Sequence, residues 1–253
     1  MRNKNLKIFN DYLQYLLRKE MLVLRKEIEK EHYDWKIIRN AIYNDCRFFE
    51  TDKEFEFNAY LNTLEADKQK QLNKIVYDVL NKAFAHKMKS FPSKFKKKLS
   101  GIFSDITPKQ FFNLNYFDAH EHRCCLCGRL LDHDAKELPV AEIEHLFPQS
   151  KFPQLILCIS NYIPCCSNCN KIKKSSFFSC KKEFIEDLQK LGKSFHHPLF
   201  FWKLFDANFD YNLPAVKKCD IVQYYKINER FNQIRHYMYS LSLIHISEPT
   251  RPY

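Results

Sequence analysis

The sequence lacks long apolar runs, a secretion signal and, for the most part, glycine. No stretch approaches the ~18 consecutive apolar residues of a membrane span. The first residues, MRNKNLKIFNDYLQ, are basic, but they contain neither an uninterrupted apolar core nor a small-residue cleavage site. Only 3 of the 253 residues are glycine, against 23 Phe and 14 Tyr, a skew that we attribute to genomic base composition. These absences predict a cytoplasmic protein with no membrane association.

Charge and cysteine content narrow the functional class. The formal net charge is +11, from 41 Lys+Arg and 30 Asp+Glu, and this excess favours a polyanionic partner, either nucleic acid or an anionic membrane surface. Hydrophobic residues make up 45%, enough for a substantial core. In a reducing compartment, the 10 cysteines are expected to be metal ligands and spare thiols rather than disulfides.

No alternating strand pattern occurs before residue 120, whereas helical periodicity is strong. Apolar residues recur at helical spacing over about 4–30, again from Trp35, and again from Leu72 to Phe84. Residues 103–118 read as a linker or a short helix. The predicted fold is mainly α with a small α+β insert. We expect a helical region at 1–119, a compact finger at 120–192 and a C-terminal helical and aromatic segment at 193–240.

The end of the chain is interpreted separately. A helical stripe after residue 168 leads to Gly192, which suits a helix C-terminus, and Asn228 can cap a last helix. Residues 241–251 read LSLIHISEPTR, which resembles the in-frame translation of a sequencing adapter. We therefore expect residues 241–253 to be read-through and not native.

A lysine cluster without any acid lies at 81–99, with Phe84, Phe91 and Phe95 interleaved. One interpretation is a phosphate-binding surface with aromatic anchors, and the other is a solvated helix end with phenylalanines in the core. The cluster's candidate nucleic-acid contacts are Lys94, Lys96, Lys97 and Lys98.

Two Cys-x-x-Cys pairs predict a zinc site. The two-residue gap lets both sulfurs of a pair bind one ion, and four thiolates close a structural site. The pairs are Cys124 with Cys127 and Cys166 with Cys169. Neighbouring Cys125 and Cys165 leave the register open. The other cysteines, Cys46, Cys158, Cys180 and Cys219, are expected to be buried small hydrophobes.

Between the pairs lie residues suited to phosphodiester hydrolysis, which needs a base for water and a cation for the leaving oxygen. His145 fits the base, and Asn161 or a backbone carbonyl could fix its other ring nitrogen. Glu144 and Asn170 offer oxygens to a hard cation such as Mg²⁺ or Mn²⁺. On a regular strand Glu144 and His145 face opposite sides, so a shared site requires a bend. The candidate phosphate contacts that follow are Lys171, Lys173 and Lys174.

This stretch resembles the HNH endonucleases, the ββα-metal finger. The matching residues are Glu144, His145, Pro148, Asn161, Cys166, Cys169, Asn170 and Lys173, and EHLFPQS is similar to the HNH lobe of RNA-guided nucleases. The resemblance covers about 123–191 and implies the HNN variant and the four-cysteine zinc subtype. It also implies His145 as general base, Asn161 as its orienting residue, and Glu144 with Asn170 as ligands of one catalytic cation.

The expected function is thus a metal-dependent endonuclease, cutting DNA rather than RNA by family resemblance. The placement of the finger among helices resembles HNH effectors of bacterial anti-phage systems, which often work beside an ATPase partner. The alternative is a zinc-stabilised nucleic-acid-binding module without cleavage activity. Glu142 is expected to be a strand residue. The remaining histidines of the region, His120, His122, His133, His196 and His197, show no clear partners in the sequence.

Overall fold

Helices make up most of the part of the protein described by the computed structural model. It describes residues 4–47, 53–99, 105–116, 122–125, 130–173, 182–183 and 186. The helices are α1 (Lys4–Lys30), α2 (Trp35–Arg47), α3 (Glu56–Leu61), α4 (Ala66–Lys87), α5 (Ser93–Lys96) and α6 (Pro108–Tyr116). The three helices expected from periodicity are confirmed as α1, α2 and α4, and the segment 103–118 contains α6. The helix expected after residue 168 is described only to residue 173 and at 182–183 and 186, and the whole of 193–253 lies outside the described residues.

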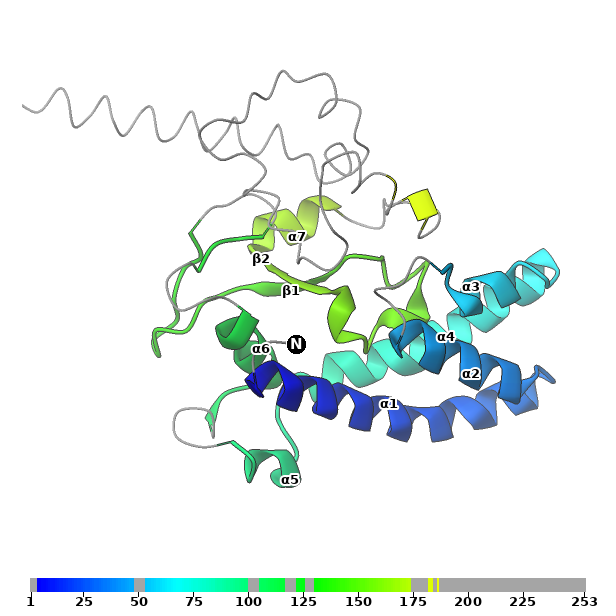
Figure 1. Ribbon diagram of the computed structural model, residues 1–253, viewed down its shortest axis with the longest axis horizontal. Helices are drawn as coiled ribbons and strands as arrows, with labels where there is room; N and C mark the ends of the chain where they lie inside the picture. Colours follow the sequence, from blue (N-terminus) through cyan, green and yellow to red (C-terminus); the bar gives the residue numbers. More distant parts are fainter. Residues whose placement is uncertain are drawn as a thin grey trace, which may run out of the picture.

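The remaining elements form a strand–strand–helix unit (Figure 1). Strand β1 (Glu142–His145) pairs antiparallel with β2 (Tyr162–Cys165). Between the strands lie two 3₁₀ turns, η2 (Pro153–Leu155) and η3 (Ile159–Asn161), and α7 (Ser167–Lys173) follows β2. The fold is therefore mostly helical with a small two-stranded antiparallel sheet.

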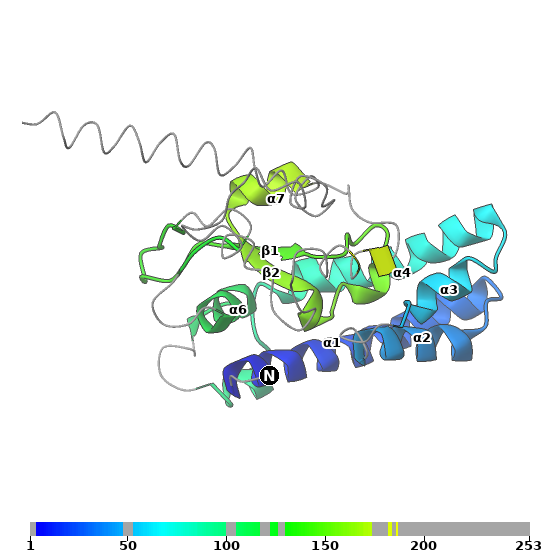
Figure 2. The ribbon, with the colours of Figure 1, turned by 45° about the horizontal axis from the view of Figure 1, so that its top comes forward.

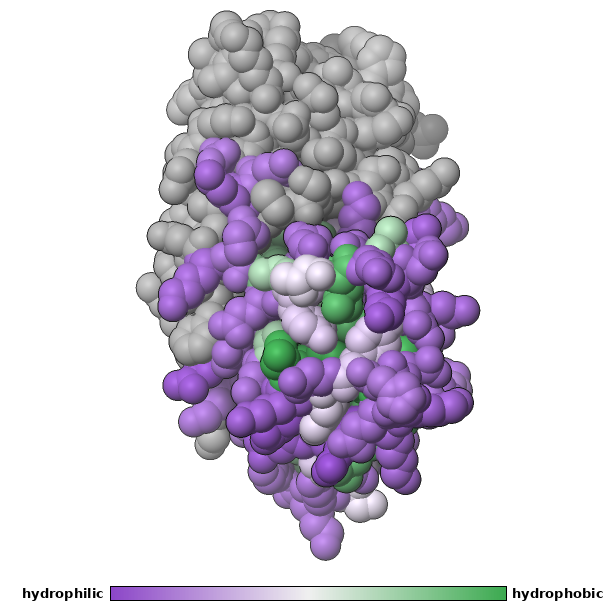
Figure 3. All heavy atoms as spheres, turned by 90° about the vertical axis from the view of Figure 1, so that its right-hand side faces the viewer, coloured by the Kyte–Doolittle hydropathy of each residue, from purple (hydrophilic) through white to green (hydrophobic). Residues whose placement is uncertain are grey.

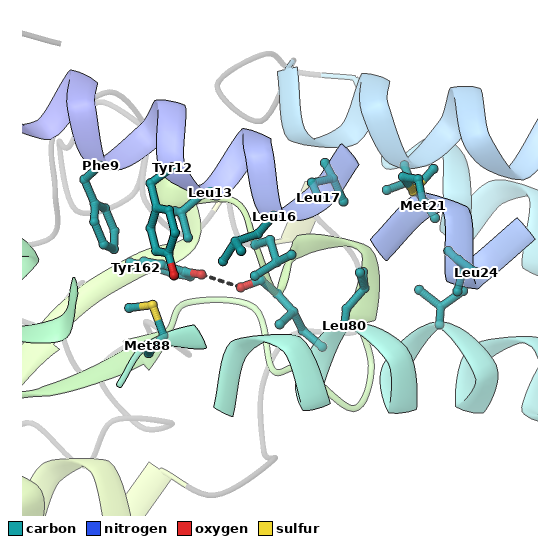
Figure 4. Packing of buried hydrophobic residues seen from close by; sticks show 14 of the residues in the cluster. Phe9, Tyr12, Leu13, Leu16, Leu17, Met21, Leu24, Leu80, Met88 and Tyr162 are labelled. Carbon is teal, nitrogen blue, oxygen red and sulfur yellow. Dashed lines mark hydrogen bonds between the residues drawn. The ribbon is translucent and has the colours of Figure 1, made fainter. Parts of the chain in front are cut away.

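One core joins the helices to this unit. Side chains of α1 such as Phe9 and Leu13 are fully buried, together with Leu80 of α4. Tyr162 of β2 belongs to the same cluster, and Figure 4 shows it beside Phe9 and Tyr12 of α1. Its ring centroid lies 6.4 Å from that of Phe9. The strands therefore pack on the helical region and share its core.

One face of the described part of the molecule is mainly polar. The face shown in Figure 3 is dominated by hydrophilic side chains, with apolar ones in scattered spots. Within the described residues, no helix is both long enough and apolar enough to cross a membrane.

Three phenylalanines near the lysine cluster belong to the interior. Phe91 and Phe95 are each 3% exposed, and Phe84 packs against the core. Phe91 and Phe95 both meet the ring of Tyr12 edge-on, at 4.9 and 5.1 Å. The core thus buries Phe91 and Phe95 and partly buries Phe84, which favours the interpretation of a helix end with phenylalanines in the core.

Candidate active site

The strands and α7 bring the two ends of the candidate motif together. In the hairpin, Glu144 lies opposite Ile163 and His145 opposite Tyr162. Helix α7, which carries Asn170, contacts β1 (Figure 2). Residues separated by a loop are thus placed on neighbouring elements.

The two faces of β1 have different surroundings. The partly buried Ile143 packs against the main core, and His145 packs against Tyr162 on the same side. Glu144 lies near Cys165, whose thiol pKa is raised by burial first and then by charges that include Glu144. Glu144 and His145 therefore occupy opposite sides of β1, as strand alternation requires.

The ring of His145 is held between aromatic side chains and is only 5% exposed. Phe84 of α4 and Tyr162 of β2 both meet it edge-on, with centroids 5.0 and 4.9 Å away. Its Nε2 lies 3.2 Å from the carbonyl oxygen of Ile156. Because a carbonyl can only accept, this contact places the ring proton on Nε2 and makes Nδ1 the basic nitrogen.

Asn161 is fully buried and bonds to the backbone beyond His145. Its Oδ1 accepts the N–H of Phe147 at 2.7 Å, and its Nδ2 donates to the carbonyl oxygens of Phe147 and Leu155. Its own carbonyl accepts the N–H of Leu146. Asn161 therefore fixes the chain that leaves β1, while the carbonyl beside the His145 ring is that of Ile156.

Asn170 lies in the middle of α7, where its backbone N–H donates to the carbonyl of Cys166 at 3.1 Å. Its side chain and that of Glu144 are both half-buried. A carboxylate and an amide oxygen are donors that suit Mg²⁺ or Mn²⁺ rather than a soft metal.

Three cysteines form a cluster that fits a soft metal. The sulfurs of Cys124, Cys166 and Cys169 all lie within 4.8 Å of one another. The N–H of Cys166 points to the sulfur of Cys124 at 3.3 Å, and that of Cys169 to Cys166 at 3.4 Å. Such N–H groups stabilise thiolates, so the donors match Zn²⁺. The expected fourth ligand, Cys127, lies outside the described residues.

The neighbouring cysteines Cys125 and Cys165 do not belong to this cluster. Both are buried, and burial raises the pKa of each thiol well above its usual range. Cys125 is also close enough to Tyr116 for a side-chain hydrogen bond. Within the described residues, the sequence register that pairs Cys124 with Cys166 and Cys169 is the one that the structure brings together.

The candidate lysines fall into two groups. Lys94 and Lys96 lie in α5, Lys97 and Lys98 directly follow it, and all four are exposed. The ammonium of Lys94 stands 3.2 Å above the centre of the Tyr15 ring. Lys171 is exposed on α7, Lys173 ends that helix, and Lys174 lies outside the described residues.

Two contacts were missed by the sequence interpretation. His122 and His133 pair with each other, with Nδ1 and Nε2 2.8 Å apart. Gln149 places its amide nitrogen 3.1 Å from Nδ1 of His145. Gln149 could have been found from its position in EHLFPQS, whereas nothing in the sequence pairs His122 with His133.

The neighbouring acid Glu142 has a different partner. Its carboxylate lies 2.7 Å from the ammonium of Lys109 in α6, across the edge of the hairpin. It is a strand residue, as expected, and the pair ties β1 to α6.

Comparison with known proteins gives a partial match. Septu protein PtuB of Bacillus thuringiensis is 30% identical over 82 residues, which is 32% of this chain. The match covers 30% of that relative, so this chain spans under a third of its length. No protein-family model and no solved structure matches the sequence. Over part of its length, the chain is thus similar to Septu protein PtuB.

Proposed function

We propose that this protein is a metal-dependent HNH endonuclease that hydrolyses phosphodiester bonds in DNA. The observation that carries the proposal is the state of His145 at the end of β1. The carbonyl of Ile156 accepts a hydrogen bond from Nε2–H, which leaves Nδ1 as the acceptor, and Asn161 fixes the adjoining chain. A histidine held in this way can remove a proton from water.

In this mechanism Nδ1 of His145 takes the proton of a water that attacks the scissile phosphorus. Glu144 and Asn170 would hold the divalent cation, which supplies positive charge for the departing oxygen when bound. Lys171, Lys173 and Lys174 would attract the phosphates next to the site, and the lysines around α5 would contact nucleic acid farther away. Cys124, Cys127, Cys166 and Cys169 would hold the structural zinc.

The proposed mechanism also requires the His145 ring to become accessible to water and substrate. His145 is 5% exposed, and its ring lies on the side of β1 opposite Glu144. Under the proposed function, the end of β1 turns the ring towards the cation when substrate binds.

The similarity to Septu protein PtuB over part of the chain supports a role in anti-phage defence. We extend the proposal accordingly to an effector of a bacterial defence system that works beside an ATPase partner.

Plasmid nicking with Mg²⁺ or Mn²⁺ tests the proposal. His145→Ala should lower the nicking rate by roughly 10²–10⁴-fold, the usual contribution of a general base. His86→Ala removes an exposed histidine of α4 and should leave the rate unchanged. Equal activity in wild type and His145→Ala would remove His145 from the mechanism.

A zinc-stabilised nucleic-acid-binding module without cleavage is the second candidate. The three-cysteine cluster and the exposed lysines favour it, since neither requires chemistry. DNA binding without nicking, in both wild type and His145→Ala, would establish this alternative.

A further inference from the structure

Gln149 contacts the candidate base from the turn that follows β1. Its amide nitrogen lies 3.1 Å from Nδ1 of His145 and 3.3 Å from Nε2. The turn itself is fixed, because the carbonyl of Pro148 accepts the N–H groups of Lys151 and Phe152 at 3.0 and 2.9 Å. The side chain of Gln149 is therefore directed at the ring by an ordered backbone.

The partners of the ring decide which of these two contacts is a hydrogen bond. Nε2 faces the carbonyl of Ile156, which also accepts the phenol of Tyr162, so Nε2 carries the proton. An N–H of Gln149 cannot bond to another N–H. The amide of Gln149 therefore donates to Nδ1, the nitrogen that would accept the proton of the attacking water.

We propose that Gln149 is a positioning residue that, together with the Ile156 carbonyl, holds Nδ1 of His145 in its accepting state and stands where the attacking water will stand. This inference rests on the proposed function. The amide N–H of Gln149 and the O–H of a water present the same kind of donor to Nδ1, so the water replaces the amide when the site opens. Until then Nδ1 is kept in its accepting state.

The surroundings explain why an amide suits this position. Phe84 and Tyr162 pack against the ring in edge-to-face contacts. The phenol of Tyr162 is directed at Ile156 instead. The loop thus supplies an amide donor to a buried ring nitrogen.

The test compares Gln149→Met, which keeps the length and loses the donor, with Gln149→Glu, which replaces the donor by an acceptor. The ring ¹⁵N signals of the histidines are recorded by NMR on the labelled full chain, at one fixed pH and without added Mg²⁺. The signals of His145 are those that disappear in His145→Ala. Wild type should show the proton on Nε2. Gln149→Met should raise the fraction of His145 with its proton on Nδ1, because the Ile156 carbonyl alone then favours the Nε2 proton. Gln149→Glu should place a proton on Nδ1. The exposed neighbour Ser150→Ala should match wild type.

Nicking kinetics supply the second readout. Gln149→Met should lower kcat by roughly 10-fold with KM for plasmid unchanged, as is typical when the partner of a functional residue is lost. Gln149→Glu should lower kcat further, because a carboxylate favours a proton on Nδ1 and a protonated Nδ1 cannot accept the proton of water. A wild-type proton on Nδ1, or spectra unaffected by both substitutions, would overturn the role of Gln149. Expected spectra without nicking by wild type would overturn the proposed function and leave the Gln149 contact established.

Discussion

At the residue scale, Asn161 holds the candidate site through the hydrogen bonds of its side-chain amide. It is 0% exposed, and its side-chain amide bonds to three backbone groups: the N–H of Phe147, the carbonyl of Phe147 and the carbonyl of Leu155. The sequence predicted that Asn161 would orient His145, but the structure shows it acting on the backbone two residues farther on. Periodicity and spacing cannot reveal this distinction, because it depends on the path of the loop.

Asn161→Ala should therefore cost stability as well as activity. It leaves a buried N–H and two carbonyls without this partner, which predicts a loss of roughly 2–3 kcal/mol in the free energy of unfolding. Urea denaturation measures this loss. Asn40→Ala on the exposed face of α2 is the control and should change little. A loss in Asn161→Ala no larger than that of the control would contradict the assigned bonds.

At the element scale, the sequence largely predicted the hairpin and α7, but it did not predict which helices pack against them. The Cys-x-x-Cys spacing correctly brought Cys166 and Cys169 to one place, with Cys124 beside them. The resemblance also anticipated the order strand, strand, helix. The packing of Phe84 on His145 joins α4 to β1 across 61 positions of the chain, and no local pattern encodes such a contact.

Removing one thiol of the cluster tests the zinc assignment. Cys127→Ser and Cys166→Ser should each lose bound zinc and destabilise the hairpin, because three remaining ligands do not close a tetrahedral site. Metal analysis of the purified chain gives the stoichiometry. Cys158→Ser, which alters a buried cysteine outside the cluster, should retain zinc. Full zinc content in Cys166→Ser would show that the metal is held elsewhere.

At the scale of the whole molecule, a buried polar network connects the helices to the loop between the strands. Asp45 of α2 accepts the N–H groups of Glu56 and Phe57, at 2.6 and 3.1 Å, where α3 begins. It also accepts the amide of Gln154 in η2 at 3.1 Å, and that amide bonds to Asn58 at 2.6 Å. A carboxyl that is 4% exposed thus ties three elements together.

Burial raises the pKa of Asp45 to about 7, outweighing the hydrogen bonds that lower it. The unfolded chain releases this proton near pH 4 and the folded chain only near pH 7. Stability therefore falls as pH rises between these values, by roughly 4 kcal/mol in total. Asp45→Asn should remove this fall.

The measurement is the free energy of unfolding of Asp45→Asn relative to wild type, at pH 5 and at pH 8. The variant should gain relative stability at pH 8. Asp78→Asn, on the exposed face of α4, should show the same difference from wild type at both values. An unchanged difference in Asp45→Asn would mean that Asp45 is charged throughout this range.

The cysteine cluster has a consequence for synthesis of the chain. Cys124 leaves the ribosome before His145, whereas Cys166 and Cys169 leave after it. The cluster can close only when both strands and the start of α7 have been made. Metal binding by the cluster would thus follow the synthesis of Cys169. A nascent chain that stops before Cys166 contains His145 but lacks two of the cluster's three cysteines.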